Sequence, residues 1–387
     1  MAGAICRWAY LHQPDGAAVS GCLAGWRATG PVGGALALAA ERSMETVAAV
    51  QRACAEANLP LVGAVYPELV VDGEFKTEGV LLFGLADMPP HVLVDGLEAG
   101  ETASRAGIDA LADFVDRHAD PNGGDTLFMA FDCLVPNIGS LIDGLYAEVG
   151  DMVHFAGANA GSESFRPMPC LFDAERIRGD AVLAVLLADH PGAVLEHGYR
   201  LRGQPILASS THGNRIDRIA GQPAFEQYCA LARSQQGAEV ARDNFYQMGV
   251  HFPFGLVRMD GDILVRIPVA LGDDDSIFCV GEIPENGLLA VVGAVEPGNM
   301  ETVRRVARGL DERGSSGALF FYCAGRRMHL QETARSELSA LQKQLPYPVL
   351  GALSLGEIGN ARQGGYPLLH NAALVGLPWP ALARERT

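Results

Sequence analysis

The stretch that decides the fold is GALALAAERS, residues 34–43, which is followed by LPLVGAVYPEL at 59–69. Near the other end of the chain the pattern returns as GALFFYCAGR (317–326) and YPVLGALSLGEI (347–358). In both places two short apolar runs flank a segment whose apolar residues recur at helical spacing. Strands without apolar–polar alternation are typical of parallel strands that are covered by helices and joined by right-handed crossovers. The repeat therefore predicts two strand–helix–strand units.

Further copies of the pattern lie between these two. A weaker strand–helix–strand pattern runs from DTLFMAFD (125–132) through a helical stretch to MVHFAGANAG (152–161). A fourth strand–helix pair begins with NGLLAVVGAVEPG (286–298) and leads directly into Gly317. In the unit that starts there, residues 328–345 are expected to form one amphipathic helix. Together the patterns predict an α/β protein of two related halves, built from repeated strand–helix–strand units with mixed, largely parallel sheets.

A change of pattern marks the expected boundary between the halves. Between residues 190 and 225 the chain loses helical periodicity and collects Gly, Pro, His and Asn, a composition typical of hairpins and turns. With 387 residues the chain is long enough for two domains. We expect the domains to span residues 30–195 and 196–377.

Composition and charge narrow the range of partners. The chain is globular in composition, with 49% hydrophobic and 19% charged residues, and its net charge of −17 disfavours nucleic acid or an anionic membrane as a partner. Eight scattered cysteines form no Cys-x-x-Cys pair, which favours buried reduced thiols over disulfides or zinc. No run of about 20 apolar residues occurs, and the first residues lack the pattern of an export signal. We therefore expect a cytoplasmic protein that binds neither nucleic acid nor a membrane.

Several segments, taken in order, carry a family resemblance. They are HGYRLRG (197–203), GNRIDRIAGQPAFEQY (213–228), DGDILVRIPV (260–269), GALFFYCAGR (317–326) and LGALSLGEIG (350–359). With them the sequence resembles the FIST family, and the resemblance assigns residues 30–195 to the FIST N-terminal domain and 196–377 to the FIST C-terminal domain. One departure concerns the turn after the second strand of the N-terminal half. Tyr66 and Pro67 stand there in place of the family's small residues, and a ring-locked φ would reshape that turn.

The resemblance also implies a function. Members of the family are regarded as intracellular sensors that bind small molecules such as amino acids, and some have been linked to haem. The resemblance thus implies a cytosolic sensor of an amino acid-like molecule or another small acid. Its signal would pass to a separate partner protein, such as a histidine kinase or a cyclic-nucleotide enzyme. Two alternatives stay open: a haem-binding gas sensor, and an enzyme that acts on a small acid through Glu357, Arg326 or Cys323.

Two turns of the C-terminal unit are the expected ligand site. The turns CAGR (323–326) and GEIG (356–359) follow neighbouring parallel strands, and ligands of α/β sheets bind outside the carboxyl ends of strands. Arg326 offers a planar fork to a carboxylate, and Glu357 can accept from an ammonium group. Alternatively, these two side chains pair with each other or cap a helix. The Gly-rich loop that follows is expected to close over the ligand. The predicted ligand-binding residues are Gly325, Arg326, Glu357, Tyr366 and His370.

The sequence predicts no catalytic residue and no metal site. Cys323 would need a neighbouring base, and His329, six positions on, is expected to point elsewhere. No zinc spacing, phosphate-binding loop or nucleophile elbow is present. We therefore expect a binding protein rather than an enzyme, without a predicted cofactor. If haem is bound, its single axial imidazole would come from His154, His197, His212, His251 or His370.

Overall fold

The structure is a computed structural model. It describes residues 4–98, 100–259, 261–293, 296, 298–360 and 365–379.

The first strand–helix–strand unit forms as predicted. The apolar runs at 34–40 and 61–66 form neighbouring parallel strands, with Ala35 opposite Leu61. The strand that follows the unit in the chain pairs antiparallel with the first of these runs, and the strand that precedes the unit pairs antiparallel with that added strand. The strand order is β1-β6-β2-β3. In chain order the elements are β1 (Ile5–Leu11), α1 (Gly16–Thr29), β2 (Gly34–Ala40), η1 (Glu41–Thr46), α2 (Val47–Glu56), β3 (Leu61–Tyr66) and β6 (Val80–Leu85).

Two further units repeat this order. The second unit is the weaker copy at 125–161 and has the strand order β7-β12-β8-β9. Its elements are β7 (His91–Asp95), α3 (Glu101–His118), β8 (Asp125–Phe131), α4 (Ile138–Val149), η2 (Gly150–Met152), β9 (Val153–Ala158) and β12 (Ala181–Leu187). The third unit has the order β13-β26-β22-β23. Its elements are β13 (Val194–Glu196), α7 (Glu301–Glu312), β22 (Gly317–Cys323), α8 (Ala324–Leu330), α9 (Glu332–Gln344), β23 (Leu350–Ser354) and β26 (Leu374–Trp379).

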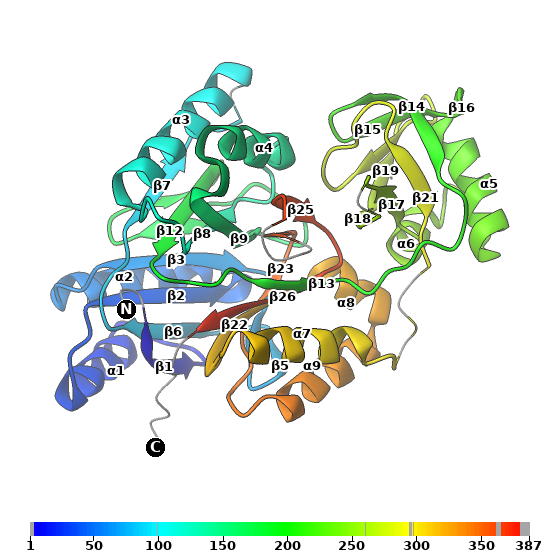
Figure 1. The fold of residues 1–387 in the computed structure, drawn as a ribbon. Coiled ribbons are helices and arrows are strands. Elements are labelled where there is room, and N and C mark those ends of the chain that lie inside the picture. Colours follow the sequence, from blue (N-terminus) through cyan, green and yellow to red (C-terminus); the bar gives the residue numbers. More distant parts are fainter. Residues whose placement is uncertain are drawn as a thin grey trace.

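Each unit sends a hairpin into the sheet of a neighbour, and this exchange closes the three units into a ring. The hairpin that follows β3 pairs with β23, the one that follows β9 pairs with β3, and the one that follows β23 pairs with β9. Three six-stranded sheets result (Figure 1). The hairpins are β4 (Leu69–Val71) with β5 (Glu74–Lys76), β10 (Leu171–Asp173) with β11 (Ile177–Arg178), and β24 (Glu357–Gly359) with β25 (Leu368–His370).

One aromatic ring from each unit meets its neighbours where the units join. Tyr66 at the end of β3 lies 5.7 Å from Phe321 of β22, and Phe128 of β8 lies 5.5 Å from the same ring, measured between centroids. Tyr66 is fully buried, so the bulky residue that departs from the family pattern fills the junction of the three units. Such aromatic pairs stabilise by about 0.5–1.5 kcal/mol each beyond the burial of their area.

The fourth predicted strand–helix pair is divided between two sheets, which corrects that expectation. β21 (Leu288–Val291) belongs to an antiparallel sheet inserted between β13 and α7 of the third unit. In Figure 1 this inserted domain stands beside the lobe that carries α3 and α4. Its other elements are β14 (Ile206–His212), β15 (Arg215–Ile219), β16 (Gln222–Pro223), α5 (Ala224–Gln236), α6 (Phe245–His251), β17 (Phe254–Val257), β18 (Ile263–Arg266), β19 (Pro268–Leu271) and β20 (Ile277–Cys279).

The predicted α/β architecture with two related halves and mixed sheets is confirmed. The N-terminal half contains two units, and the C-terminal half contains the third unit with the inserted domain. Parallel ladders do not predominate, however: in the described residues only the central pair of each unit is parallel. The other ladders are antiparallel because hairpins and returning strands build the rest of each sheet. The expected boundary between residues 195 and 196 falls inside β13 and stays a prediction.

The helix expected over 328–345 is broken in two. Gln331 has a φ of 49°, which is left-handed backbone, and it separates α8 from α9. The break turns α9 back toward the start of α8, so that a residue of α9 faces the turn after β22. This arrangement decides the role of Arg326, described below.

Candidate functional site

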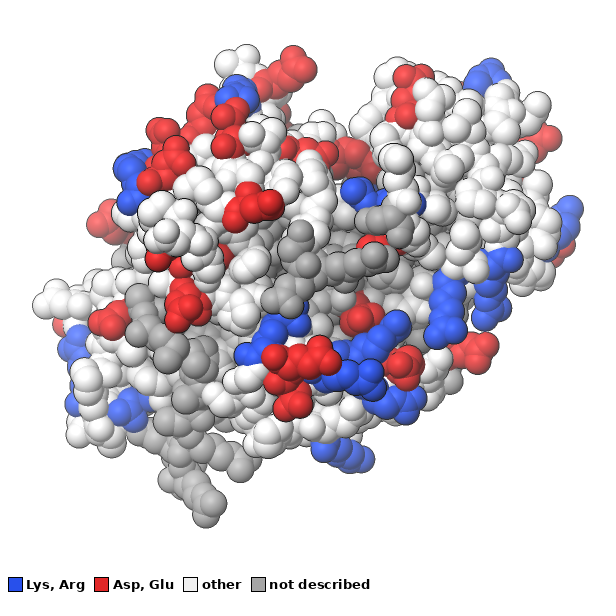
Figure 2. Space-filling model, viewed as in Figure 1, with Lys and Arg blue, Asp and Glu red and all other residues white. Residues whose placement is uncertain are grey.

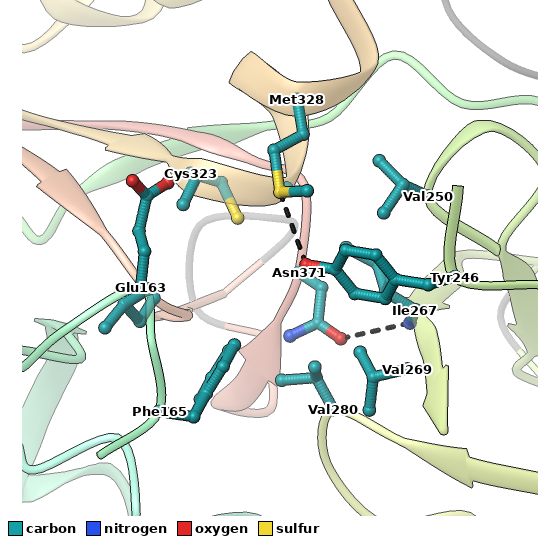
Figure 3. Close-up of a pocket in the computed structure, with 13 residues that line it drawn as sticks. Glu163, Phe165, Tyr246, Val250, Ile267, Val269, Val280, Cys323, Met328 and Asn371 are labelled. Carbon is teal, nitrogen blue, oxygen red and sulfur yellow. Dashed lines mark hydrogen bonds between the residues drawn. The ribbon is translucent and has the colours of Figure 1, made fainter. Parts of the chain in front are cut away.

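A cleft lies between the core and the inserted domain, at the point where α8 begins. Its walls come from the turn after β22, from the connection between β9 and β10, and from α6 and β19 of the inserted domain (Figure 3). The space within it is about 460 Å³, part of which is open to solvent. The lining residues are Glu163, Phe165, Tyr246, Val250, Ile267, Val269, Val280, Cys323, Ala324, Gly325, Met328, Leu355 and Asn371.

Three large apolar side chains on the rim of the cleft remain exposed. Phe165, Tyr246 and Met328 are 43%, 41% and 37% exposed, respectively. The Tyr246 hydroxyl donates to the Met328 sulfur over 3.4 Å and thereby links α6 to α8. Phe165 has a φ of 51°, an unfavourable backbone for a bulky residue that costs of the order of 1 kcal/mol or more. Exposed apolar rims and strained backbone are both typical of binding sites.

One charged side chain, Glu163, lines the cleft. Its carboxylate accepts two hydrogen bonds from Nη2 of Arg327, at 2.8 and 2.6 Å, and Nη1 of the same Arg327 lies 2.6 Å from Glu68. Burial raises the pKa of Glu163, an effect that Arg327 opposes and that the nearby charges of Glu68 and Glu41 reinforce. The Arg327 guanidinium is thus shared by the carboxylates of Glu163 and Glu68, so this part of the rim carries excess negative charge.

Gly325, one of the predicted ligand-binding residues, lies on the cleft wall. A Cβ atom at this position would approach Cδ1 of Ile267 to 2.4 Å, so the absence of a side chain lets the inserted domain come close. Beside it, the Cys323 sulfur accepts a hydrogen bond from the Ala372 amide over 3.1 Å. Burial raises the pKa of Cys323 well above its ordinary value, and the thiol is therefore protonated. The Ile267 amide donates to Oδ1 of Asn371 over 3.4 Å (Figure 3).

Arg326 points away from the cleft and into the core. It is fully buried, and its Nε and Nη2 atoms donate to the two carboxylate oxygens of Glu337 on α9, at 2.8 and 2.7 Å. Nη1 donates to the carbonyl oxygens of His197 and Ala372. The Tyr322 hydroxyl donates to the same Glu337 over 2.6 Å. The guanidinium is thus committed to a structural ion pair, but with Glu337 rather than with Glu357.

Glu357 does not share a crevice with Arg326. It is the first residue of β24, which leaves the third unit and joins the sheet of the second. The two turns nevertheless lie close together, because the Glu357 carboxylate is hydrogen-bonded to Cys323 of the other turn and is influenced by the charge of Arg326. Its carboxylate is fully buried and accepts from the Ser354 hydroxyl at 2.6 Å and from the Ala373 amide at 3.3 Å. Burial raises the pKa of Glu357 to about 7, although these hydrogen bonds oppose the shift.

Tyr366 and His370 lie outside this cleft. Tyr366 is 38% exposed and meets Tyr146 of α4 edge-on, with 4.6 Å between the ring centroids. His370 is buried, and burial lowers its pKa to about 3, with the charges of His197 and Arg266 adding to the effect. Residues 361–364 of the loop predicted to close over the ligand lie outside the described residues.

Family models cover most of the chain. A model of the FIST N domain matches residues 35–222, and a model of the FIST C domain matches residues 224–360. The chain belongs to the FIST family. FIST domains are sensory domains associated with signal transduction and are not known as catalytic ones. Among curated proteins, none matches the chain significantly.

The FIST N and FIST C matches meet inside the inserted domain of this FIST protein. The first ends at β16, after the hairpin of β14 and β15, and the second begins with α5. The cleft therefore draws on both matches: Glu163 and Phe165 come from the FIST N domain, whereas Tyr246, Gly325 and Met328 come from the FIST C domain.

Most residues of the cleft in this FIST protein escaped sequence reasoning. Glu163 and Phe165 belong to an irregular connection, and Tyr246 and Val250 belong to a short helix of the inserted domain. Nothing in their local pattern indicates a site, because only the tertiary arrangement brings them to Gly325. The left-handed backbone of Phe165 is the clearest signal, and it is visible in the structure alone.

His329, six positions after Cys323, contacts a histidine of the inserted domain. Nδ1 of His329 lies 2.8 Å from Nδ1 of His251, across α8 and α6. Within the described residues, no group of three or more His, Cys, Asp or Glu side chains is placed to hold a metal ion. Over the same residues, no helix combines the length and the apolar character needed to cross a lipid bilayer.

Proposed function

We propose that this FIST protein is a sensor of a small, largely apolar molecule that carries an ammonium or hydroxyl group. The ligand occupies the cleft beside Gly325. The single observation that carries the proposal is the lining of this cleft, which is mostly apolar and contains one charged side chain, that of Glu163.

The charges of the cleft favour a ligand that donates a hydrogen bond over a ligand that carries a carboxylate. None of the lining residues is a Lys, Arg or His, and Arg327 is already bound to Glu163 and Glu68. A ligand carboxylate would face these acidic groups without a cation of its own. An ammonium group would instead gain a charge-assisted hydrogen bond. The small acid expected from the sequence therefore gives way to an amine or an alcohol, because Arg326 is used within the core.

The position of the cleft suggests how binding is signalled. Phe165 and Gly325 belong to the core, whereas Tyr246 and Val250 belong to the inserted domain. A ligand that contacts both sides stabilises one placement of the inserted domain relative to the core, which is the differential interaction that a switch requires. A separate signalling protein, such as a histidine kinase or a cyclic-nucleotide enzyme, would recognise that placement.

The thiols support action in the cytoplasm. All eight cysteines of the chain lie among the described residues, none of them is in a disulfide, and four of them are buried. Cysteines outside disulfides are the rule in a reducing compartment. This supports the cytoplasmic part of the proposal.

Haem does not fit this cleft. Axial ligation requires an imidazole, a thiolate or a comparable donor. No histidine lines the cleft, the Cys323 thiol is held protonated by burial, and the two other donors of the lining, Tyr246 and Met328, are hydrogen-bonded to each other. The described residues therefore favour an organic ligand over the gas-sensor alternative.

Three probes of one shape test the proposed ligand class. Phenethylamine, phenethyl alcohol and hydrocinnamate share a phenyl ring and differ in the polar group. In calorimetric titrations we expect the amine to bind most tightly and the acid least. Glu163→Gln should reduce the affinity for the amine by about 10- to 150-fold, the value of one charged hydrogen bond, and leave the alcohol nearly unaffected.

A matched control is Glu56→Gln, which removes an exposed carboxylate from α2 and should leave all three affinities unchanged. Tightest binding of hydrocinnamate would contradict the proposal. So would an amine affinity that survives Glu163→Gln unchanged.

A further inference from the structure

A second cleft separates the inserted domain from the second unit. Its walls come from the start of α4 on one side and from β17, β18 and the segment after β20 on the other. Figure 2 shows the hollow between these two lobes, with basic and acidic side chains at its base. None of its lining residues lines the cleft beside Gly325, so the two sites are separate.

Arg266 lines this second cleft and is a buried cation without an ionic partner. It is 4% exposed, yet its hydrogen bonds go only to main-chain carbonyls: Nε to Glu282, and Nη1 to Val265 and Leu369, at 2.9–3.1 Å. Among the described residues, Nη2 has no acceptor and no carboxylate forms an ion pair with Arg266. Burial lowers the pKa of Arg266 to about 10, and the nearby charges of Glu282 and Asp143 oppose this shift. A guanidinium has five N–H donors, so two remain for a ligand.

A second guanidinium, that of Arg258, lines the same cleft. Its Cζ atom lies 5.8 Å from the ring centroid of Tyr366, the residue that the sequence analysis expected in a ligand site. Within the described part of the chain Arg258 makes no ion pair. The hydroxyl groups of Ser140 and Thr211 add uncharged donors to the wall.

The carboxylates that line the cleft either accept hydrogen bonds from other protein groups or lie at its outer edge. The Glu282 carboxylate accepts from the Gly139 and Ser140 amides, at 3.0 and 2.8 Å, and so caps the positive end of α4. Asp143 is hydrogen-bonded to Tyr366, and burial raises its pKa. Glu285, on the turn after Pro284, is exposed to solvent. Glu282 and Asp143 therefore act on Arg266 through space, without an ion pair among the described residues, and the Nη2 donors of Arg266 stay without an acceptor there.

We propose that this cleft binds a small molecule through an oxyanion, a carboxylate or a phosphate, held by Arg266 and Arg258. A buried charge is costly unless it is well paired, and among the described residues Arg266 donates only to carbonyl oxygens, with Glu282 and Asp143 as more distant counter-charges. The two unused N–H groups of Nη2 can each donate a charge-assisted hydrogen bond to an oxyanion. The proposal stands whether or not the apolar cleft binds an amine.

Calorimetric titration with inorganic phosphate and with acetate, at an ionic strength fixed by sodium chloride, tests the site. We expect saturable binding of at least one probe, and competition between the two. The tighter probe tells whether the natural ligand bears a phosphate or a carboxylate. Arg258→Gln should weaken binding about 10- to 150-fold. Because Arg258 makes no ion pair among the described residues, the melting temperature without anion should stay at the wild-type value.

Arg52→Gln on α2 is the matched control, since it removes the same charge from an exposed site and should leave anion binding unchanged. Arg266→Lys keeps the positive charge but removes the guanidinium group and its Nη2 donors, and we expect weaker binding of both probes. The proposal is overturned if the wild-type protein binds neither probe, or if Arg258→Gln binds the anions as tightly as the wild type does.

Discussion

Removal of the Arg326 guanidinium should destabilise the fold rather than abolish ligand binding directly. Arg326 and Glu337 have side chains only 1% and 3% exposed and are joined by two hydrogen bonds. Arg326→Ala leaves the Glu337 carboxylate buried with Tyr322 as its remaining donor. Breaking a buried ion pair on one side costs about 3–5 kcal/mol. Urea denaturation followed by circular dichroism should show a loss of that order in the free energy of unfolding.

Two companion variants separate this explanation from a general loss of packing. Arg326→Met combined with Glu337→Met removes both charges and should recover most of the lost stability, because apolar replacements of a buried pair are often neutral. Arg304→Ala removes an exposed pair with Glu301 on α7 and should cost at most about 1 kcal/mol. An Arg326→Ala protein with the wild-type denaturation midpoint would refute the structural role.

Three further predictions follow from buried groups at or near the cleft. The pKa of Glu357 in the folded protein is about 7, against an ordinary value of 4.5, so its ionisation destabilises the fold as the pH rises through that window. The free energy of unfolding of Glu357→Gln should therefore rise by up to about 3 kcal/mol relative to the wild type between pH 5 and 8. A variant whose stability depends on pH as that of the wild type does would contradict this. Burial lowers the pKa of His251, so the stability of its contact with His329 is present above pH 6.5 and lost on acidification. The protection factors of the α6 amides, which are corrected for the intrinsic pH dependence of exchange, should fall as the pH is lowered, and protection factors that do not change with pH would argue against it. Gly325→Val places atoms against Ile267 and should weaken amine binding by the equivalent of about 1–3 kcal/mol in titration, with unchanged affinity as the opposing result.

Local patterns were sufficient to predict the repeated units. The apolar runs at 34–40, 125–131 and 317–323 are almost fully buried in the structure, as their lack of alternation predicted. At the turn of the first hairpin, Asp72 and Gly73 both have the positive φ that is typical of an Asp-Gly hairpin turn. The sequence does not indicate which sheet each hairpin joins. That choice depends on how three units close into a ring, which is a tertiary property.

The candidate site was predictable only in part, for the same reason. Gly325 was identified because it follows a buried strand. Arg326 was misjudged because the left-handed Gln331 turns Glu337 toward it, whereas the sequence predicts a continuous helix. Glu163 lies 162 positions before Gly325 in the chain and approaches it through the second unit. No local periodicity reports such a contact.

The most direct test of the proposed ligand site is a crystal structure of the protein with phenethylamine. The account predicts the phenyl ring among Phe165, Tyr246 and Met328, with the ammonium nitrogen within hydrogen-bonding distance of a Glu163 carboxylate oxygen. A ligand bound in this cleft without contact to Glu163, or bound elsewhere while the cleft stays empty, would contradict it.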